Sequence, residues 1–342
     1  MQQVETVQGP IDIDNLGITL MHEHLLLDRR HVWEKPRDTS AAFADAEVSM
    51  NILTELKHNP YGNYDNNFML DIPAACEEVM VFKEAGGTSI VEVTPEGLGR
   101  EPEGLKEISI NTGTSVIMGC GYYLEKLHPA YMKDYSKEKI ADKICSDLLE
   151  GVGPDKIKAG IIGEIGISPD MTKAEVNVLK GAVLAQKQTG KILTIHLPGW
   201  ERYAHQVLDI VEKQGGYPEM VVLNHMNPSM YDLKYQLSLA DRGAFLEYDM
   251  IGIDLLFPEG QSPTDDENAK AVVQLLEKGY RSSLLLSQDV FLKNLMKAYG
   301  GGGYAHILTN FIPRLKSYGV TEEDISAILE TNPKEVFRRA KG

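Results

Sequence analysis

Residues 159–225 contain three runs of one kind, AGIIGEI (159–165), ILTIH (192–196) and MVVLNH (220–225), and these runs decide the fold class. Each run is almost wholly apolar, as expected for a parallel strand with both faces buried. The intervening stretches 172–189 and 202–214 carry apolar residues three or four positions apart, which predicts helices. Strands that alternate with helices predict a parallel sheet covered by helices.

Further strand-like runs extend this pattern to both sides. They are residues 17–21, 89–93, 115–119, 244–249 and 283–289, which bring the total to eight. Additional helices are expected at residues 72–85, 136–150, 229–241, 268–278 and 304–318. Eight such units predict a (β/α)8 TIM barrel, with residues 1–342 as one domain. No G-x-G-x-x-G follows the first strand, which disfavours a doubly wound sheet.

Composition excludes several function classes. Asp and Glu number 50 against 34 Lys and Arg, and the formal net charge of −16 disfavours binding to nucleic acid or to an anionic membrane. The three cysteines lack C-x-x-C spacing and indicate a reducing compartment. The first residues do not resemble a signal peptide, and no apolar run is long enough to span a membrane. We therefore expect a soluble cytoplasmic protein.

Two stretches interrupt the strand and helix rhythm. Residues 25–71 show no clear strand, and a long loop in a compact domain is more often functional than idle. The run YGGGGY (299–304) offers a backbone that could approach a ligand closely or simply form a flexible loop. Near the end of the chain, Thr321 and Asn332-Pro333 predict two helix starts, each with an N-cap side chain.

Polar residues end five of the apolar runs. They are His22, His24, Glu164, His196, His225 and Asp289. The carboxyl ends of barrel strands gather on one rim, where active sites of this fold are built, so these side chains should converge. A purely structural role would require each buried polar group to find its own partner. The shared rim instead predicts a metal centre.

Alternation along a strand places His22 and His24 on one face and Glu23 on the other. Six nitrogen and oxygen ligands without a thiolate suit Zn²⁺, or Mn²⁺, Co²⁺ or iron. Six ligands are too many for one ion, so we expect two divalent metal ions. His22, His24 and Asp289 would hold one and His196 and His225 the other, with Glu164 between them. A two-metal site of this kind predicts hydrolysis.

Several motifs then resemble the phosphotriesterase-like branch of the amidohydrolase superfamily, which includes phosphotriesterases, lactonases and phosphotriesterase homology proteins. The motifs are GITLMHEHL (17–25), AGIIGEIGIS (159–168), TIHLPG (194–199), LNHMNP (223–228), LLSQD (285–289), GGGGYAHILTNFIPRLK (300–316) and ETNPKEVF (330–337). The resemblance implies a (β/α)8 barrel with a binuclear zinc-type centre and the same ligand assignment. Glu164 would replace the carboxylated lysine of the best-known members, because Lys158 precedes the strand.

The expected mechanism is attack by a metal-bridging hydroxide, with Asp289 as the catalytic proton shuttle. By this resemblance, Tyr123 stands at the position where lactonases of the family carry a tyrosine beside the metals. Met250 stands where long-chain lactonases look to carry an arginine, which disfavours acyl-homoserine lactones. These observations predict opening of a small polar lactone.

The resemblance also implies that a subset of relatives opens phosphorylated sugar lactones, and cations near the rim could bind such a phosphate. The candidates are Lys293, Lys234 and Arg29–Arg30, with backbone amides of the glycine loop and Tyr304 beside Lys293. A phosphotriesterase or phosphoester hydrolase is the alternative enzyme, and a degenerate barrel acting as a binding protein is the alternative of another class. Relatives of this kind are often homodimers, so a homodimer is expected.

Overall fold

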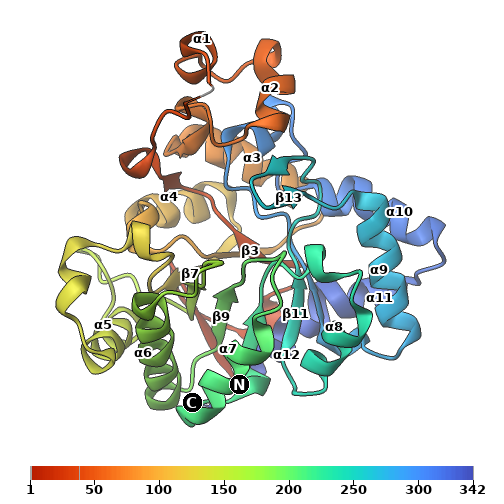
Figure 1. The fold of residues 1–342 in the computed structure, drawn as a ribbon. Coiled ribbons are helices and arrows are strands. Elements are labelled where there is room, and N and C mark those ends of the chain that lie inside the picture. The colour runs from red at the N-terminus through yellow and green to blue at the C-terminus, as the bar shows by residue number, and fades with distance from the viewer. Residues whose placement is uncertain (1, 38, 342) are drawn as a thin grey trace.

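The computed structural model describes residues 2–37 and 39–341. Its main sheet has eight parallel strands: β3 (Thr19–Glu23), β6 (Ser89–Glu92), β7 (Ser115–Cys120), β8 (Ile161–Gly166), β9 (Leu193–His196), β10 (Val221–Leu223), β11 (Phe245–Tyr248) and β14 (Leu284–Leu286). Neighbours in the sheet follow chain order from β3 to β14. The two strands at the ends of this order, β3 and β14, contact each other, and the His22 N–H donates to Ser287 Oγ, just after β14, at 3.1 Å. The predicted TIM barrel is confirmed (Figure 1).

Helices surround the sheet. They are α3 (Ile72–Glu84), α4 (Pro102–Thr112), α5 (Lys137–Leu149), α6 (Lys173–Thr189), α7 (Ala204–Lys213), α8 (Leu233–Ala240), α9 (Asp265–Glu277), α10 (Ile312–Ser317), α11 (Glu322–Ser326) and α12 (Asn332–Arg338). Helix α4 was not predicted. Its buried face includes small residues such as Gly104 and Ser109, so the apolar spacing is weak. A Cβ on Gly104 would lie 2.7 Å from Leu26 Cδ1, so close packing requires the small residue.

The C-terminal helices correct one expectation. Thr321 caps α11 as predicted, because its hydroxyl accepts the Asp324 N–H. Asn332 does not cap a new helix: the chain runs from α11 through a π-helical turn, Ala327–Thr331, directly into α12. The Asn332 amide instead donates to the carbonyls of Arg281 and Leu284, both at 2.7 Å. Its side chain therefore ties α12 to the start of β14.

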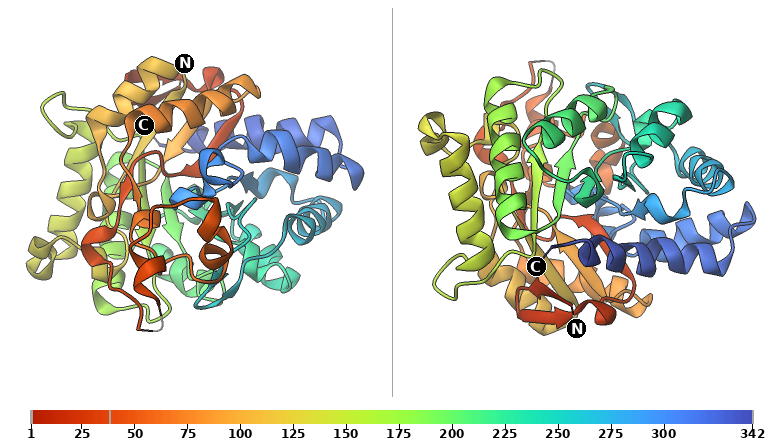
Figure 2. Two further views of the ribbon diagram at one scale, coloured as in Figure 1. Left: turned by 90° about the horizontal axis from the view of Figure 1, so that it is seen from above. Right: turned by 90° about the horizontal axis from the view of Figure 1, so that it is seen from below.

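The end of the barrel that holds both termini is filled with apolar side chains. Met21, Val91 and Phe245 from the strands pack there with Val4 of the hairpin β1 (Gln3–Thr6) and β2 (Gly9–Asp12), and with Phe337 of α12. Viewed from below, this hairpin and the C-terminal helix lie at that end (Figure 2, right). Polar chemistry is left to the opposite end.

Residues 25–37 and 39–71, which include α1 (Ala41–Ala44) and α2 (Leu53–His58), lie at that opposite end (Figure 1). A short antiparallel pair, β4 (Leu27–Asp28) with β5 (Phe68–Met69), joins the two ends of this long segment. After β11, a second small hairpin forms from β12 (Leu256–Phe257) and β13 (Gly260–Gln261). Within the part of the chain that the structure describes, no helix is long and apolar enough to cross a membrane.

Candidate metal centre

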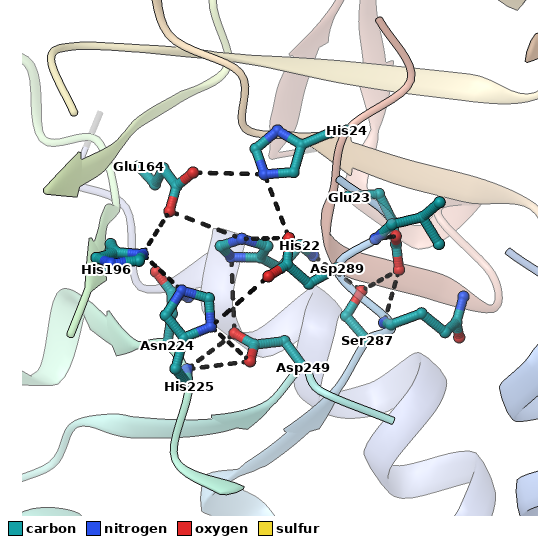
Figure 3. Close-up of polar contacts among 12 residues, drawn as sticks. His22, Glu23, His24, Glu164, His196, Asn224, His225, Asp249, Ser287 and Asp289 are labelled. Carbon is teal, nitrogen blue, oxygen red and sulfur yellow. Dashed lines mark hydrogen bonds and ion pairs between the residues drawn. The ribbon is translucent and has the colours of Figure 1, made fainter. Parts of the chain in front are cut away.

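All six residues predicted to bind metal meet at the carboxyl ends of the strands (Figure 3). His24 Nε2 lies 3.4 Å from Glu164 Oε1 and 3.3 Å from Asp289 Oδ1. His22 Nε2 lies 3.5 Å from the same Asp289 oxygen. His196 Nδ1 lies 3.3 Å from Glu164 Oε2 and 2.6 Å from His225 Nε2. One compact cluster thus forms from five strands.

Several polar atoms of the cluster have no hydrogen-bond partner in the described part of the chain, which is expected of a site that binds cations. Both ring nitrogens of His22, Glu164 Oε2 and Asp289 Oδ1 are buried without a hydrogen-bond partner among the described residues. Such atoms are costly unless something satisfies them. Four sets of ligand atoms each lie within 4.8 Å of one another: His22, His24 and Glu164; His22, His225 and Asp289; Glu164, His196 and His225; and, behind the centre, His22, Glu247 and Asp249. Glu164 is the carboxylate that belongs to two of these sets, one with His22 and His24 and one with His196 and His225, as a ligand shared by two metals would.

Charge within the cluster keeps both acids ionised. Burial opposes the charged form of Asp289, but His22 and His24 outweigh burial and hold the pKa of this carboxyl well below its usual range. Burial likewise opposes ionisation of Glu164, yet His196 and His22 lower its pKa. Two buried carboxylates beside imidazoles are the donor set that suits divalent metals such as Zn²⁺.

A buried carboxylate lies behind His225. Both oxygens of Asp249 accept the His225 N–H, at 3.1 and 2.9 Å, and Oδ1 lies 2.9 Å from His225 Nδ1. The backbone of His225 is left-handed, with φ of +56°, which a non-glycine residue keeps only when its surroundings enforce it. Asp249 therefore fixes the backbone and turns Nε2 of the ring toward the centre.

A second carboxylate, that of Glu92, supports His24 through the Thr94 hydroxyl. The Thr94 hydroxyl donates to Glu92 Oε1, and its oxygen lies 2.8 Å from His24 Nδ1. Because Thr94 uses its hydrogen on Glu92, it can accept one from Nδ1, which leaves Nε2 free for a metal. Burial raises the pKa of Glu92 to about 7, although His24 and Thr94 oppose that rise.

Sequence reasoning missed Asp249 and Glu92. Both lie in runs that were assigned as strands, and the signal used for Glu164 would have found them, because each is an acid near the carboxyl end of an apolar run. Glu23 was expected to face away from His22 and His24. It does so, and its carboxylate accepts a hydrogen bond from the Ser287 hydroxyl at 2.7 Å (Figure 3).

A cavity of about 420 Å³ opens above the centre. His24, Glu164, His196, His225 and Asp289 line its base, together with Met250. The lining of the cavity also includes Arg29, Tyr61, Tyr123, Lys126, Trp200, Phe257, Glu259 and Phe291. Several come from residues 25–71 and from the loop after β11, so the predicted functional role of the long loop has a structural basis. The volume suits a small molecule.

Tyr123 lies where the sequence placed it. Its hydroxyl is 3.2 Å from His196 Nδ1 and 3.4 Å from Nε2, and the side chain lines the cavity. Burial, and after it the charge of Glu164, raises the pKa of this phenol well above its ordinary value. Tyr123 is therefore a neutral hydroxyl beside the centre.

The lysines expected to bind phosphate lie elsewhere. Lys293 Nζ donates to Asp65 and lies 5.7 Å from the centroid of the Phe68 ring. Lys234 is exposed on α8. Neither is among the residues that line the cavity. The structure thus places both cations outside the lining of this cavity, where Asp65 engages Lys293 and Lys234 faces solvent.

The glycine loop and Tyr304 also have structural roles. The N–H groups of Gly300, Gly301 and Gly303 donate to Lys297, Met296 and Leu295 carbonyls, so they form no phosphate cradle. A Cβ on Gly301 would meet the Leu295 carbonyl oxygen at 2.1 Å, which explains the glycine by packing. The buried Tyr304 donates its hydroxyl to the His24 carbonyl at 2.7 Å and supports the end of β3.

A (β/α)8 barrel with this cluster at the carboxyl ends of its strands defines a metal-dependent hydrolase. Comparison with known proteins names the group. The chain belongs to the Phosphotriesterase family, whose sequence pattern matches residues 2–337. Members of this family are binuclear metal enzymes, in agreement with the resemblance seen in the motifs.

Individual relatives cover nearly the whole chain. An N-acetyltaurine hydrolase of Tetraodon nigroviridis is 35% identical over 97% of each chain. A resiniferatoxin-binding protein from Rhodobacter sphaeroides is 44% identical, with a TM-score of 0.97 over 100% of this chain and 96% of the other. The phosphotriesterase homology protein from Escherichia coli, with phosphate in its active site, is 25% identical, with a TM-score of 0.80 over 95% and 99%.

Proposed function

We propose that the protein hydrolyses the carbonyl–nitrogen bond of a small N-acyl amide. The observation that carries this proposal is the similarity to N-acetyltaurine hydrolases over 97% of both chains, combined with the six residues that meet beneath the cavity. The reaction adds water to the carbonyl carbon and releases a carboxylic acid and an amine. The cavity of about 420 Å³ has room for such a molecule.

His22, His24 and Asp289 would hold one divalent ion, and His196 and His225 the other, with Glu164 shared. We propose Zn²⁺ as the natural metal because the donors are imidazole and carboxylate. When bound, the metal pair lowers the pKa of coordinated water and withdraws charge from the substrate carbonyl.

The side chains of the chain supply proton transfer and positioning. Asp289, whose pKa is held low, accepts a proton from water at a carboxylate oxygen and passes it to the leaving nitrogen. The neutral Tyr123 hydroxyl is placed to donate a hydrogen bond to the carbonyl oxygen as negative charge develops there. Thr94 and Asp249 hold His24 and His225 in orientation throughout the reaction.

Lactone opening is the second candidate, and Tyr123 favours it. The tyrosine stands beside His196, at the position where it resembles the tyrosine of lactonases. An opened lactone keeps its leaving oxygen tethered inside the cavity, so the proton from Asp289 has a short path. We propose a small polar lactone as this second substrate, and Lys293 and Lys234, which do not line the cavity, are not assigned to binding it.

A substrate panel on purified protein tests both candidates. The protein is loaded in turn with Zn²⁺, Mn²⁺ and Co²⁺ and offered N-acetyltaurine, N-acetylglycine, γ-butyrolactone, sugar lactones with and without phosphate, and paraoxon. We expect the highest kcat/KM for an amide. A lactone turned over faster than every amide would transfer the assignment to the second candidate, and a preference for paraoxon would make the protein a phosphotriesterase. Absence of turnover with full metal occupancy would favour a binding protein.

A further inference from the structure

Arg29 stands apart from the other cations around the barrel rim. It follows β4, is half-buried, and lines the same cavity as His24, Glu164 and Asp289. Its neighbour Arg30 is neutralised by Asp28, with Nε–Oδ1 at 3.0 Å and NH2–Oδ2 at 2.9 Å. Among the residues that the structure describes, no carboxylate forms an ion pair with Arg29. A cation inside the substrate cavity thus lacks a counter-charge.

An aromatic ring holds Arg29 in place. The guanidinium carbon lies 4.3 Å from the centroid of the Tyr61 ring. The guanidinium carries five N–H donors, more than a contact with one tyrosine can use, so donors remain for hydrogen bonds to a ligand. A planar fork of donors presented in this way matches the oxygens of a carboxylate, sulfonate or phosphate.

Aromatic side chains continue from Tyr61 around the cavity. The Phe257 and Phe291 rings are stacked, with centroids 6.3 Å apart, and Phe257 lies 5.9 Å from Tyr61 and 5.8 Å from Trp200. These rings offer an apolar surface beside the guanidinium. A molecule that reaches from Arg29 to the metal centre would lay its apolar middle against them.

The charge of the whole chain makes this cation significant. A net charge of −16 repels anions, so an anionic substrate needs a local positive site to bind. Apart from the predicted metal ligands, two further charged side chains line the cavity, Lys126 and Glu259, and both are exposed to solvent. Solvent screens them, and their opposite signs offset one another. Arg29 remains as the half-buried charge that can select a ligand.

We propose that Arg29 recognises an anionic group at the end of the substrate remote from the bond that is cut. The substrate is then an N-acyl compound, or a lactone, that carries a carboxylate, sulfonate or phosphate. The position of that bond rests on the proposed hydrolysis, whereas anion binding by Arg29 does not. Of the cations that the sequence offered for binding an anionic substrate, Arg29 thereby takes this role in place of Lys293.

Binding to an inactive protein separates the two questions. In a metal-loaded Asp289→Asn background, calorimetry measures N-acetylglycine against its neutral analogue N-acetylglycinamide. N-acetyltaurine and N-acetyl-O-phosphoethanolamine compare the other two anions. We expect at least one anionic member to bind tenfold or more tightly than the neutral analogue. Adding Arg29→Gln should remove that preference. Arg30→Gln should retain it, because Arg30 faces Asp28.

Glu259→Gln supplies a change of opposite sign. Removing this negative charge from the cavity should tighten anion binding about twofold while leaving the neutral analogue unchanged. An Arg29→Gln protein that keeps the anion preference, or an Arg29 protein that binds no anion better than the neutral analogue, would overturn the inference. Thermal unfolding of each variant shows whether it is folded, and Arg29→Lys provides a milder change that keeps the charge.

Outcomes for hydrolysis are distinct. If active enzyme cuts neutral amides as readily as anionic ones, the proposed function stands and the role of Arg29 fails. If the protein cuts none of the panel but binds anions in an Arg29-dependent way, the role of Arg29 stands and the proposed function fails.

Discussion

Glu23 clamps the backbone on both sides of Asp289. Its Oε1 accepts the Gln288 N–H at 2.7 Å, and its Oε2 accepts the Val290 N–H at 2.9 Å. Asp289 between them has a left-handed backbone, with φ of +51°. The carboxylate thus joins the first strand to the segment after the last strand and aims Asp289 at the centre. Glu23, which lies between His22 and His24 in the sequence, thus positions the predicted metal ligand Asp289, 266 positions later.

Glu23→Gln tests this clamp. An amide can accept at one oxygen only, so one backbone N–H loses its acceptor, at a cost of about 1–3 kcal/mol in the free energy of unfolding. We expect kcat to fall about tenfold or more, because Asp289 loses its fixed position. Glu78→Gln is the matched control: Glu78 accepts the Lys297 and Ala298 N–H groups in the same segment, away from the centre. A similar loss of kcat in both variants would assign Glu23 a merely structural role.

Asp289→Asn tests the proton shuttle. Asparagine tolerates a left-handed backbone, so folding should be preserved. It cannot accept a proton, and we expect kcat to fall 10²- to 10⁴-fold. Turnover and metal content are measured together, since loss of metal alone would also abolish activity. Near-normal turnover at full occupancy would show that another group moves the proton.

Metal removal should destabilise the fold. Without cations, the buried His22, Glu164 and Asp289 retain polar atoms that have no partner. Dialysis against a chelator is therefore expected to lower Tm by several degrees, and Zn²⁺, Mn²⁺ or Co²⁺ should restore it. An unchanged Tm after verified removal of metal would contradict a buried binuclear site.

The ion pair between Arg100 and Asp147 should be important for stability. The pair has an N–O distance of 2.8 Å, and side-chain exposures are only 3% and 6%. Arg100→Met leaves the Asp147 carboxylate buried with a partly exposed partner, Lys143, and should cost about 3–5 kcal/mol in chemical unfolding. Lys143→Gln, which removes the more exposed partner of Asp147, should cost about 1 kcal/mol or less. Equal losses would show that burial does not decide the strength of these pairs.

Asp265 should contribute a pH-dependent part of stability. Burial opposes its ionisation, but the hydrogen bond and the charge of His306 outweigh burial and lower its pKa below 3.8. Its folded pKa lies below its unfolded pKa, so its stabilising contribution is present above about pH 4 and is lost as pH falls through the folded value. The difference in unfolding free energy between wild type and Asp265→Asn should therefore shrink on acidification from pH 6 to pH 3. A difference that stays constant would contradict the shift.

The barrel and its centre could be predicted from sequence for one physical reason. Parallel strands bring their carboxyl ends to a single rim, so an acid or a histidine at the end of an apolar run has a known location. That rule placed His22, Glu164 and Asp289 together without any knowledge of the loops. Applied to every run, it would also have found Glu92 and Asp249.

Contacts made by the loops could not be read in the same way. Lys293 follows the eighth strand, as a substrate ligand might be expected to do, yet it pairs with Asp65, 228 positions earlier. Arg29 and Arg30 are adjacent in sequence, but only Arg30 is neutralised, by Asp28. Such choices depend on how residues 25–71 fold across the rim (Figure 2, left), and no periodicity records that path.

Residues 25–71 also separate the part of the chain that contacts the substrate from the part that carries the reactive centre. The strand ends carry the reactive centre, whereas this segment brings Leu27, Arg29, Val32 and Tyr61 to the cavity. After gene duplication, substitutions in this segment can change the substrate specificity while the catalytic residues at the strand ends are kept by selection. Related barrels can thus differ in substrate after changes confined to about a seventh of their length, which makes the segment a natural starting point for directed evolution.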